Sequence, residues 1–132
     1  SGVGSFGLEC LSRGAKHVTF VENYDSVLLI LKKNLESLEL ENNFKILEQD
    51  AINGISKNDL LSCYDIVFVD PPYLERNLMK ILNNIYRDNI LNLKNLIIIH
   101  RHKKDEDEFP KNFQIIDKKE YGISKIIFGC FD

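Results

Sequence analysis

Apolar positions follow two alternating patterns along the chain, continuous runs typical of buried strands and spacings of three or four typical of helices. Strands are expected where β-branched and aromatic residues cluster, over residues 17–21, 44–48, 65–69, 96–99, 113–116 and 125–131. Helices are expected where Leu, Ile or Phe recurs at helical spacing, over residues 6–12, 25–40 and 74–90. Residues 51–62 predict a weaker, partly helical connection.

The alternation of strands with helices predicts an α/β fold with a mostly parallel sheet that is covered on both faces. The first four strands lack a period of two, as expected for strands buried on both sides. The last two strands are separated by a short stretch that contains Tyr121-Gly122, and they predict an antiparallel pair. The whole chain, residues 1–132, is expected to form one domain.

Composition excludes several classes of protein. Seventeen Lys and Arg against twenty Asp and Glu give a net charge of −3, which argues against a general nucleic-acid coat but not against an enzyme with one local RNA-binding patch. No apolar run approaches the ~18 residues of a membrane span, so no membrane partner is expected. Cys10, Cys63 and Cys130 form no CxxC pair, which argues against a disulfide framework and a zinc site. A reducing cytoplasm and a monomeric state are expected.

Two charged stretches follow the fourth expected strand. The basic cluster His100-Arg101-His102-Lys103-Lys104 fits contact with RNA phosphates and a solvated strand end equally well. Its histidines have no Cys or carboxylate partner at ligand spacing, so no metal is expected. The acidic run Asp105-Glu106-Asp107-Glu108 is expected to be a solvated loop.

Carboxylates lie directly or shortly after the ends of three of the expected strands. Glu22 follows the first, Asp50 the second and Asp70 the third. In an open α/β sheet, ligands bind beyond the carboxyl ends of the strands. A single carboxylate there is more often a turn former, but three of them together with a glycine loop predict one ligand-binding crevice.

The glycine loop Gly2-Val3-Gly4-Ser5-Phe6-Gly7 matches the pattern G-x-G-x-x-G, and Glu22 lies twenty positions after Gly2. This spacing is typical of a carboxylate that accepts hydrogen bonds from ribose hydroxyls. Glycine allows the backbone to approach an adenosine-bearing ligand closely. The pattern alone does not distinguish a dinucleotide from S-adenosylmethionine.

The tetrapeptide Asp70-Pro71-Pro72-Tyr73 favours S-adenosylmethionine. Two prolines fix the backbone and remove two N–H donors, so the loop offers only hydrogen-bond acceptors. Such a loop suits the exocyclic amine of a nucleobase, which donates two hydrogen bonds, and Tyr73 could stack on the base. Acceptors that hold both protons would aim the nitrogen lone pair at an electrophile.

These motifs resemble a known family, the RsmD-type small-subunit ribosomal RNA guanine-N2 methyltransferases of class I. The resemblance rests on residues 1–15, on Phe20-Val21-Glu22-Asn23, on Gln49-Asp50-Ala51 and on Asp70–Tyr73, and it extends over nearly the whole chain. It implies a Rossmann-like class I methyltransferase sheet. It also implies S-adenosylmethionine as cofactor and small-subunit rRNA or an assembling ribosomal subunit as partner.

The resemblance further implies a role for each matched residue. Gly2 and Gly4 would approach the methionine part of the cofactor, and Glu22 would hold the ribose, with Asn23 beside the adenine. Asp50 would accept a hydrogen bond from the adenine amine, with Ala51 next to it. The catalytic residues Asp70, Pro71, Pro72 and Tyr73 would grip a flipped guanine.

One departure and several alternatives accompany this resemblance. The family's first strand and its terminal acidic residue would lie before Ser1, so the chain is expected to be an amino-terminally shortened piece. The same acceptor loop suits methylation of adenine N6 or cytosine N4. A non-catalytic cofactor- or RNA-binding fragment is a further alternative. An NAD-dependent oxidoreductase would share the glycine pattern but would have no use for Asp70–Tyr73.

Overall fold

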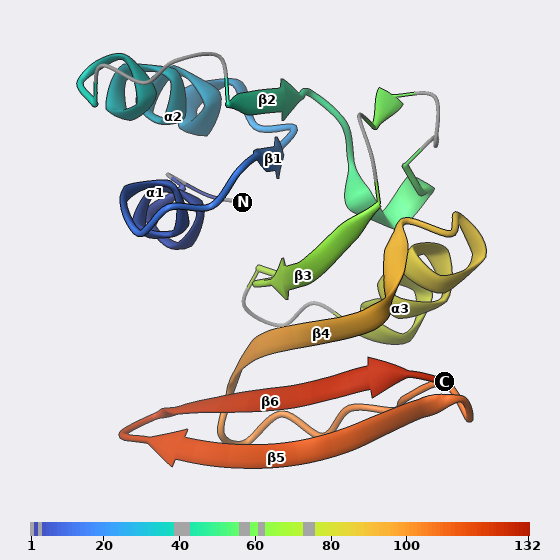
Figure 1. Cartoon of the computed structure of the whole chain (residues 1–132). Helices are drawn as coiled ribbons and strands as arrows, with labels where there is room; N and C mark the ends of the chain where they lie inside the picture. Colours follow the sequence, from blue (N-terminus) through green and yellow to red (C-terminus); the bar gives the residue numbers. More distant parts are fainter. Residues whose placement is uncertain (1, 3, 39–42, 56–58, 61–62, 73–75) are drawn as a thin grey trace. The chain divides into compact units, whose positions relative to one another are not determined.

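The computed structural model describes residues 2, 4–38, 43–55, 59–60, 63–72 and 76–132. The chain divides into two compact units, residues 1–51 and 52–132, and each is treated by itself. Figure 1 shows their helices and strands. In the described ranges no helix is both long and apolar enough to cross a lipid bilayer.

The first unit pairs two helices with a two-stranded parallel sheet. Its elements are α1 (Ser5–Ser12), β1 (Val18–Val21), α2 (Asp25–Glu36) and β2 (Phe44–Leu47). β1 and β2 run parallel with Val18 opposite Phe44 and Val21 opposite Leu47. Because the chain must cross over to make a parallel pair, α2 is the connection between the two strands.

A small apolar core holds the first unit together. It consists of Leu11 from α1, Phe20 from β1, and Leu31 and Leu35 from α2. Their spacing on α2 is the helical repeat on which the expectation rested, and Leu28 is buried on the same helix. The helix ends at Glu36, before the expected limit, and Leu38 beyond it is 42% exposed.

The second unit is built on a four-stranded mixed sheet in the order β3-β4-β6-β5. Its elements are the 3-10 helix η1 (Ala51–Asn53), which starts at the boundary of the first unit, β3 (Tyr64–Val69), α3 (Leu78–Arg87), β4 (Leu91–His102), β5 (Phe113–Tyr121) and β6 (Ser124–Phe131). β3 and β4 are parallel, whereas β6 runs antiparallel to both β4 and β5. The predicted C-terminal antiparallel pair is confirmed.

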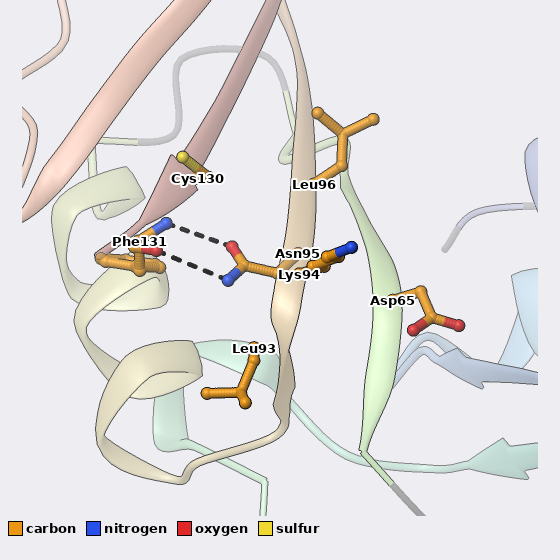
Figure 2. Close-up of a pocket in the computed structure, with 7 residues that line it drawn as sticks. All are labelled: Asp65, Leu93, Lys94, Asn95, Leu96, Cys130 and Phe131. Atoms are coloured by element: carbon orange, nitrogen blue, oxygen red, sulfur yellow. Dashed lines mark hydrogen bonds between the residues drawn. The ribbon is translucent and has the colours of Figure 1, made fainter.

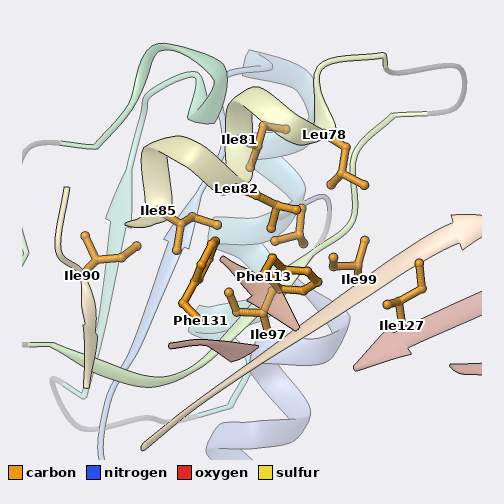
Figure 3. Packing of buried hydrophobic residues seen from close by; sticks show 11 residues of the cluster. Leu78, Ile81, Leu82, Ile85, Ile90, Ile97, Ile99, Phe113, Ile127 and Phe131 are labelled. Carbon is orange, nitrogen blue, oxygen red and sulfur yellow. The ribbon is translucent and has the colours of Figure 1, made fainter. Parts of the chain in front are cut away.

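One face of α3 closes the core of this unit. Leu78, Ile81, Leu82 and Ile85 of this helix are all buried in the core cluster, as their spacing of three and four predicts. Figure 3 shows these side chains over Ile97 and Ile99 of β4, with the rings of Phe113 and Phe131 beside them. These two rings meet edge to face, with their centroids 5.3 Å apart.

The acidic run differs from its expectation as a solvated loop. Asp105 and Asp107 turn inward, whereas Glu106 and Glu108 are exposed. The Arg101 guanidinium donates from Nε to Asp107 Oδ2 at 3.0 Å and from Nη2 to Asp107 Oδ1 at 2.9 Å. Exposed and inward-facing acids alternate, so that Asp105 and Asp107 lie beside buried cations. These two residues stabilise the fold, and only Glu106 and Glu108 match the expected solvated loop.

Candidate functional site

Glu22 stands at the carboxyl end of β1, as its position in the sequence predicts. Its carboxylate accepts three backbone hydrogen bonds within the first unit. Oε1 accepts from Gly2 N at 2.7 Å, and Oε2 accepts from Asn23 N at 3.0 Å and Tyr24 N at 3.3 Å. Glu22 is only 9% exposed. Its hydrogen bond with Gly2 fixes the glycine loop against the end of the strand.

The environment of Glu22 favours its ionised form. Burial by itself raises the pKa of this carboxyl. The N–H groups of Gly2 and Tyr24, which donate to the carboxylate, are among the groups that outweigh burial, and the pKa is lowered. Glu22 therefore presents a negative charge beside the glycine loop at neutral pH.

The glycine loop enters α1 through Gly4. Gly4 is the N-cap of α1 and has a φ of 85°, in the left-handed region that favours glycine. A Cβ on Gly4 would lie 2.4 Å from Leu31 Cδ1 and 3.2 Å from Phe20 Cε1, so packing also requires glycine here. A Cβ on Gly2 would meet nothing within 4 Å. A side chain at Gly2 would thus enter open space, whereas a side chain at Gly4 would enter the core.

The other predicted cofactor residues lie at or near the carboxyl ends of β1 and β2. Asn23 is exposed directly after Glu22, and Asp50 is half-buried three positions beyond β2. Ala51 begins η1. Because β1 and β2 are parallel, their carboxyl ends share one edge of the two-stranded sheet. Glu22, Asn23 and Asp50 therefore belong to the same end of the first unit.

Asp70 follows β3 directly in the second unit, and its side chain is 50% exposed. Pro71 is half-buried and Pro72 is exposed. Tyr73 lies outside the described residues, so its stacking role stays a prediction. The expectation that Glu22, Asp50 and Asp70 face one crevice involves both units, and it stays a prediction too.

His100 is a partner of Asp70 that sequence reasoning missed. Its ring atom Nδ1 lies 3.0 Å from Asp70 Oδ1. The pair forms because β3 and β4 are parallel neighbours with Val69 opposite Ile99, which sets the next residue of each strand side by side. Only the strand register reveals this contact, since the two residues are thirty positions apart.

Arg101, one of the basic cluster expected to contact RNA, is not available for that contact. The Arg101 side chain is 4% exposed and is bound by Asp107, whereas Lys103 and Lys104 are exposed. A hollow near this end of the unit is lined by both signs of charge, from Arg76, Leu78, Met79, Arg101, Lys104, Asp105, Glu106, Asp107 and Glu108. Among the described residues, no group of three or more His, Cys, Asp or Glu side chains is placed to hold a metal ion.

A second hollow lies away from Asp70, near the amino ends of β3 and β4 (Figure 2). It is lined by Asp65, Leu93, Lys94, Asn95, Leu96, Cys130 and Phe131. Phe131 N donates to Asn95 Oδ1 at 3.1 Å, and Asn95 Nδ2 donates to the Phe131 carbonyl at 3.5 Å. Asp65 and Asp70 are five positions apart along extended backbone, about 16 Å, so this hollow is distinct from the predicted site.

Known proteins similar to this chain include rRNA methyltransferases. The family described as Conserved hypothetical protein 95 matches residues 1–130. The chain is 31% identical over 124 residues to the ribosomal RNA small subunit methyltransferase D of Haemophilus influenzae, with 93% of this chain and 64% of that protein covered. The chain thus spans somewhat less than two thirds of that relative's length.

Solved structures support the same assignment. The crystal structure of a proposed methylase from Haemophilus influenzae is 30% identical, with a TM-score of 0.82, and covers 97% of this chain and 80% of that one. A protein of the NADB-Rossmann superfamily from Streptococcus agalactiae gives a TM-score of 0.77 at 14% identity, with 99% and 59% covered, a likeness of fold alone. The expected Rossmann-like α/β fold is confirmed. The resemblance to RsmD-type methyltransferases is confirmed as well, and the chain belongs to the family described as Conserved hypothetical protein 95.

Proposed function

We propose that the protein transfers a methyl group from S-adenosylmethionine to the exocyclic N2 amine of a guanine in small-subunit rRNA. The name of the Haemophilus influenzae relative supports rRNA as the substrate class. The partner is small-subunit rRNA or the assembling subunit, and the setting is the cytoplasm. Guanine N2 is the target that the resemblance implies.

The observation that carries the proposal is the exposed carboxylate of Asp70 at the end of β3, followed by two prolines. This loop offers acceptors and no N–H donor at Pro71 or Pro72, which suits an amine that donates two hydrogen bonds. Positive charge develops on the amine nitrogen during transfer, and the amine releases one proton with or after it. A fixed carboxylate stabilises that charge more in the transition state than in the ground state.

The first unit fits the cofactor through its own donors and acceptors. A buried carboxylate at the end of β1 and the open backbone of Gly2 match the ribose and the methionine part that the family places there. We assign Glu22 to the ribose, Asn23 and Asp50 to the adenine, Gly2 and Gly4 to the methionine part, and Ala51 to the wall beside the adenine. S-adenosylmethionine would supply a sulfonium methyl group, which leaves behind a neutral thioether.

The second unit has to receive a base that has left its stack. Extrusion of a nucleotide costs a few kcal/mol, which contacts with the extruded base offset. Asp70, the Pro71 carbonyl and Tyr73 are the groups we assign to that base. Most of the rate acceleration would come from proximity and orientation.

Two substitutions, one in each unit, test this division of roles. Asp70→Ala removes the charge-stabilising carboxylate, and we expect single-turnover methyl transfer to small-subunit rRNA to fall about a hundredfold or more. Glu22→Gln weakens charge-assisted hydrogen bonds, each worth roughly 1.5–3 kcal/mol. We therefore expect affinity for S-adenosylmethionine, measured by calorimetry, to fall about tenfold or more.

Asp65→Ala is the matched control, because Asp65 is an exposed carboxylate on β3, the strand that Asp70 follows, and lines the other hollow. It should leave transfer unchanged. Near-normal transfer by Asp70→Ala would contradict the proposal, and lost cofactor binding by that variant would move Asp70 into the cofactor pocket. Digestion of the labelled RNA to nucleosides identifies the modified base. Methyladenosine or methylcytidine among the products would show that the target is adenine or cytosine and not guanine.

A further inference from the structure

The contact between His100 and Asp70 joins two residues at the carboxyl ends of adjacent parallel strands. The distance from His100 Nδ1 to Asp70 Oδ1 is 3.0 Å. Both side chains are accessible, with 36% of His100 and 50% of Asp70 exposed. An exposed pair of this kind contributes only about 0–1 kcal/mol to stability. The pair therefore contributes little to the stability of the fold. Its main consequence is the orientation of the Asp70 carboxylate.

The chemistry of the pair fixes which atom carries the proton. An ionised carboxylate can only accept hydrogen bonds, so His100 Nδ1 must be protonated to donate to it. This holds for the neutral ring and for the imidazolium. The contact thereby determines the tautomer of His100 and ties down one of the two oxygens of Asp70.

We propose that His100 is a positioning residue for Asp70: its Nδ1–H holds Oδ1 and directs Oδ2 at the amine that receives the methyl group. The proposal rests on the proposed function. The two prolines fix the backbone after Asp70, but they leave its side-chain torsions free. His100 restricts those torsions, so the carboxylate does not have to be ordered during the reaction.

Substitution of His100 separates this role from a general effect of the ring. His100→Leu replaces the ring by an apolar side chain of moderate size and so removes the donor. His100→Asn keeps an N–H donor at a similar distance from the backbone. We expect the single-turnover rate at saturating cofactor and RNA to fall about tenfold in His100→Leu, less than the roughly hundredfold loss that a misplacement of about 1 Å can cause. His100→Asn should restore most of the rate. Affinity for S-adenosylmethionine should be unchanged in both variants.

A double-mutant cycle tests whether His100 acts through Asp70. In the Asp70→Ala background, His100→Leu should cause no further loss of rate. A further tenfold loss there would overturn the proposal, and so would an unchanged rate for His100→Leu alone or failure of His100→Asn to restore activity.

A measurement independent of activity keeps this inference separate from the proposed function. Nitrogen-15 NMR of the His100 ring in the wild-type protein should find the proton of the neutral form on Nδ1. In Asp70→Ala that preference should be lost. A ring protonated only on Nε2 in the wild type would overturn the inference even if methyl transfer occurs. Absent methyl transfer by the wild type, with the proton on Nδ1, would instead contradict the proposed function.

Discussion

Gly4 illustrates how one residue can be required for two different reasons. Its φ of 85° disfavours other residues, and the Leu31 and Phe20 side chains occupy the space that a Cβ would need. The sequence motif suggests a ligand as the reason for glycine, whereas the structure adds packing of α1 against β1 and α2. Gly14 has a similar φ of 97° but open space around it, which makes it a matched comparison.

We predict that Gly4→Ala destabilises the protein by about 2–5 kcal/mol, from left-handed strain of about 1–2 kcal/mol and overpacking of about 1–3 kcal/mol. Gly14→Ala should destabilise the protein only by the cost of left-handed strain, about 1–2 kcal/mol. Urea denaturation of both variants checks this expectation. Equal losses for the two substitutions would show that the contacts with Leu31 and Phe20 relax without cost.

Site residues differed in how far the sequence could predict them. Glu22 and Asp70 could be located because each directly follows an apolar run, and the carboxyl end of a strand is a place that pattern alone defines. The partnership of His100 with Asp70 could not, because it depends on which residues of β3 and β4 lie opposite each other. Interpreting His100 as one of a basic cluster missed its carboxylate partner for that reason.

At the scale of elements, the acidic run divides between buried and exposed positions. Arg101 and Asp107 have side chains only 4% and 7% exposed, and Asp105 Oδ2 lies 3.5 Å from Arg101 Nε. On the other side, the Lys125 ammonium donates to the Asp105 carbonyl. This arrangement anchors the turn that follows β4 to two buried cations.

Asp107→Asn should therefore destabilise the second unit by about 3 kcal/mol, because a buried guanidinium then lacks its bidentate partner. Glu106→Gln removes an equal charge from the exposed position next to it and should change stability by less than about 0.5 kcal/mol. Thermal and urea unfolding of the two variants give the comparison. Similar small effects would mean that Arg101 keeps its partner through Asp105 alone.

The end of α3 carries a carboxylate that links it to the preceding loop. Asp88, the C-cap residue, accepts from Ile55 N at 3.0 Å and from Arg87 Nε at 2.9 Å. Burial alone raises the pKa of Asp88, but these two hydrogen bonds and the charge of Arg87 outweigh it, and the pKa lies below its ordinary value.

A lowered pKa in the folded state means that Asp88 stabilises the fold above its unfolded pKa, about 3.9. That contribution is lost as the pH falls through the folded pKa. Asp88→Asn should cost about 1 kcal/mol at pH 7, and the difference from wild type should shrink toward pH 2. Urea denaturation across this range checks the trend, with exposed Glu120→Gln as the control for loss of a charge. A difference that does not vary with pH would contradict an ionic role.

Elements with a strong apolar repeat could be predicted, whereas polar strands were underestimated. All four apolar positions named for α3 are buried, so its inner face followed from the sequence. β4 starts at Leu91, five residues before its expected start, because backbone pairing continues through polar positions such as Asn92 and Lys94. β5 extends to Tyr121 although nearly all of it is exposed, since its ladder with β6 supplies the order.

For the molecule as a whole, the net charge of −3 means that the proposed binding to RNA has to come from local patches of positive charge. Lys103 and Lys104 are exposed just beyond the end of β4, the strand that carries His100. Reversing both charges should weaken binding to small-subunit rRNA. The slope of the logarithm of the affinity against the logarithm of the salt concentration should become less steep by about 1.4, since each lost phosphate contact on single-stranded RNA contributes ~0.7.

Reversal of Lys118 and Lys119 is the control, because both are exposed on β5 and the change in net charge is equal. This second variant should retain the wild-type salt slope. If both variants alter the slope equally, binding responds only to overall charge, and the patch after β4 has no special role.

The strand order of the second unit affects how it can be completed during synthesis. β6 follows β5 in the chain but lies between β4 and β5 in the sheet. A nascent chain that has emerged only as far as β5 therefore holds a strand with no partner in its own sheet. Adjacent charged side chains discourage such a strand from pairing with another chain, and β5 carries Asp117, Lys118, Lys119 and Glu120 in succession. These four charges are therefore expected to discourage β5 from pairing with another chain until β6 arrives.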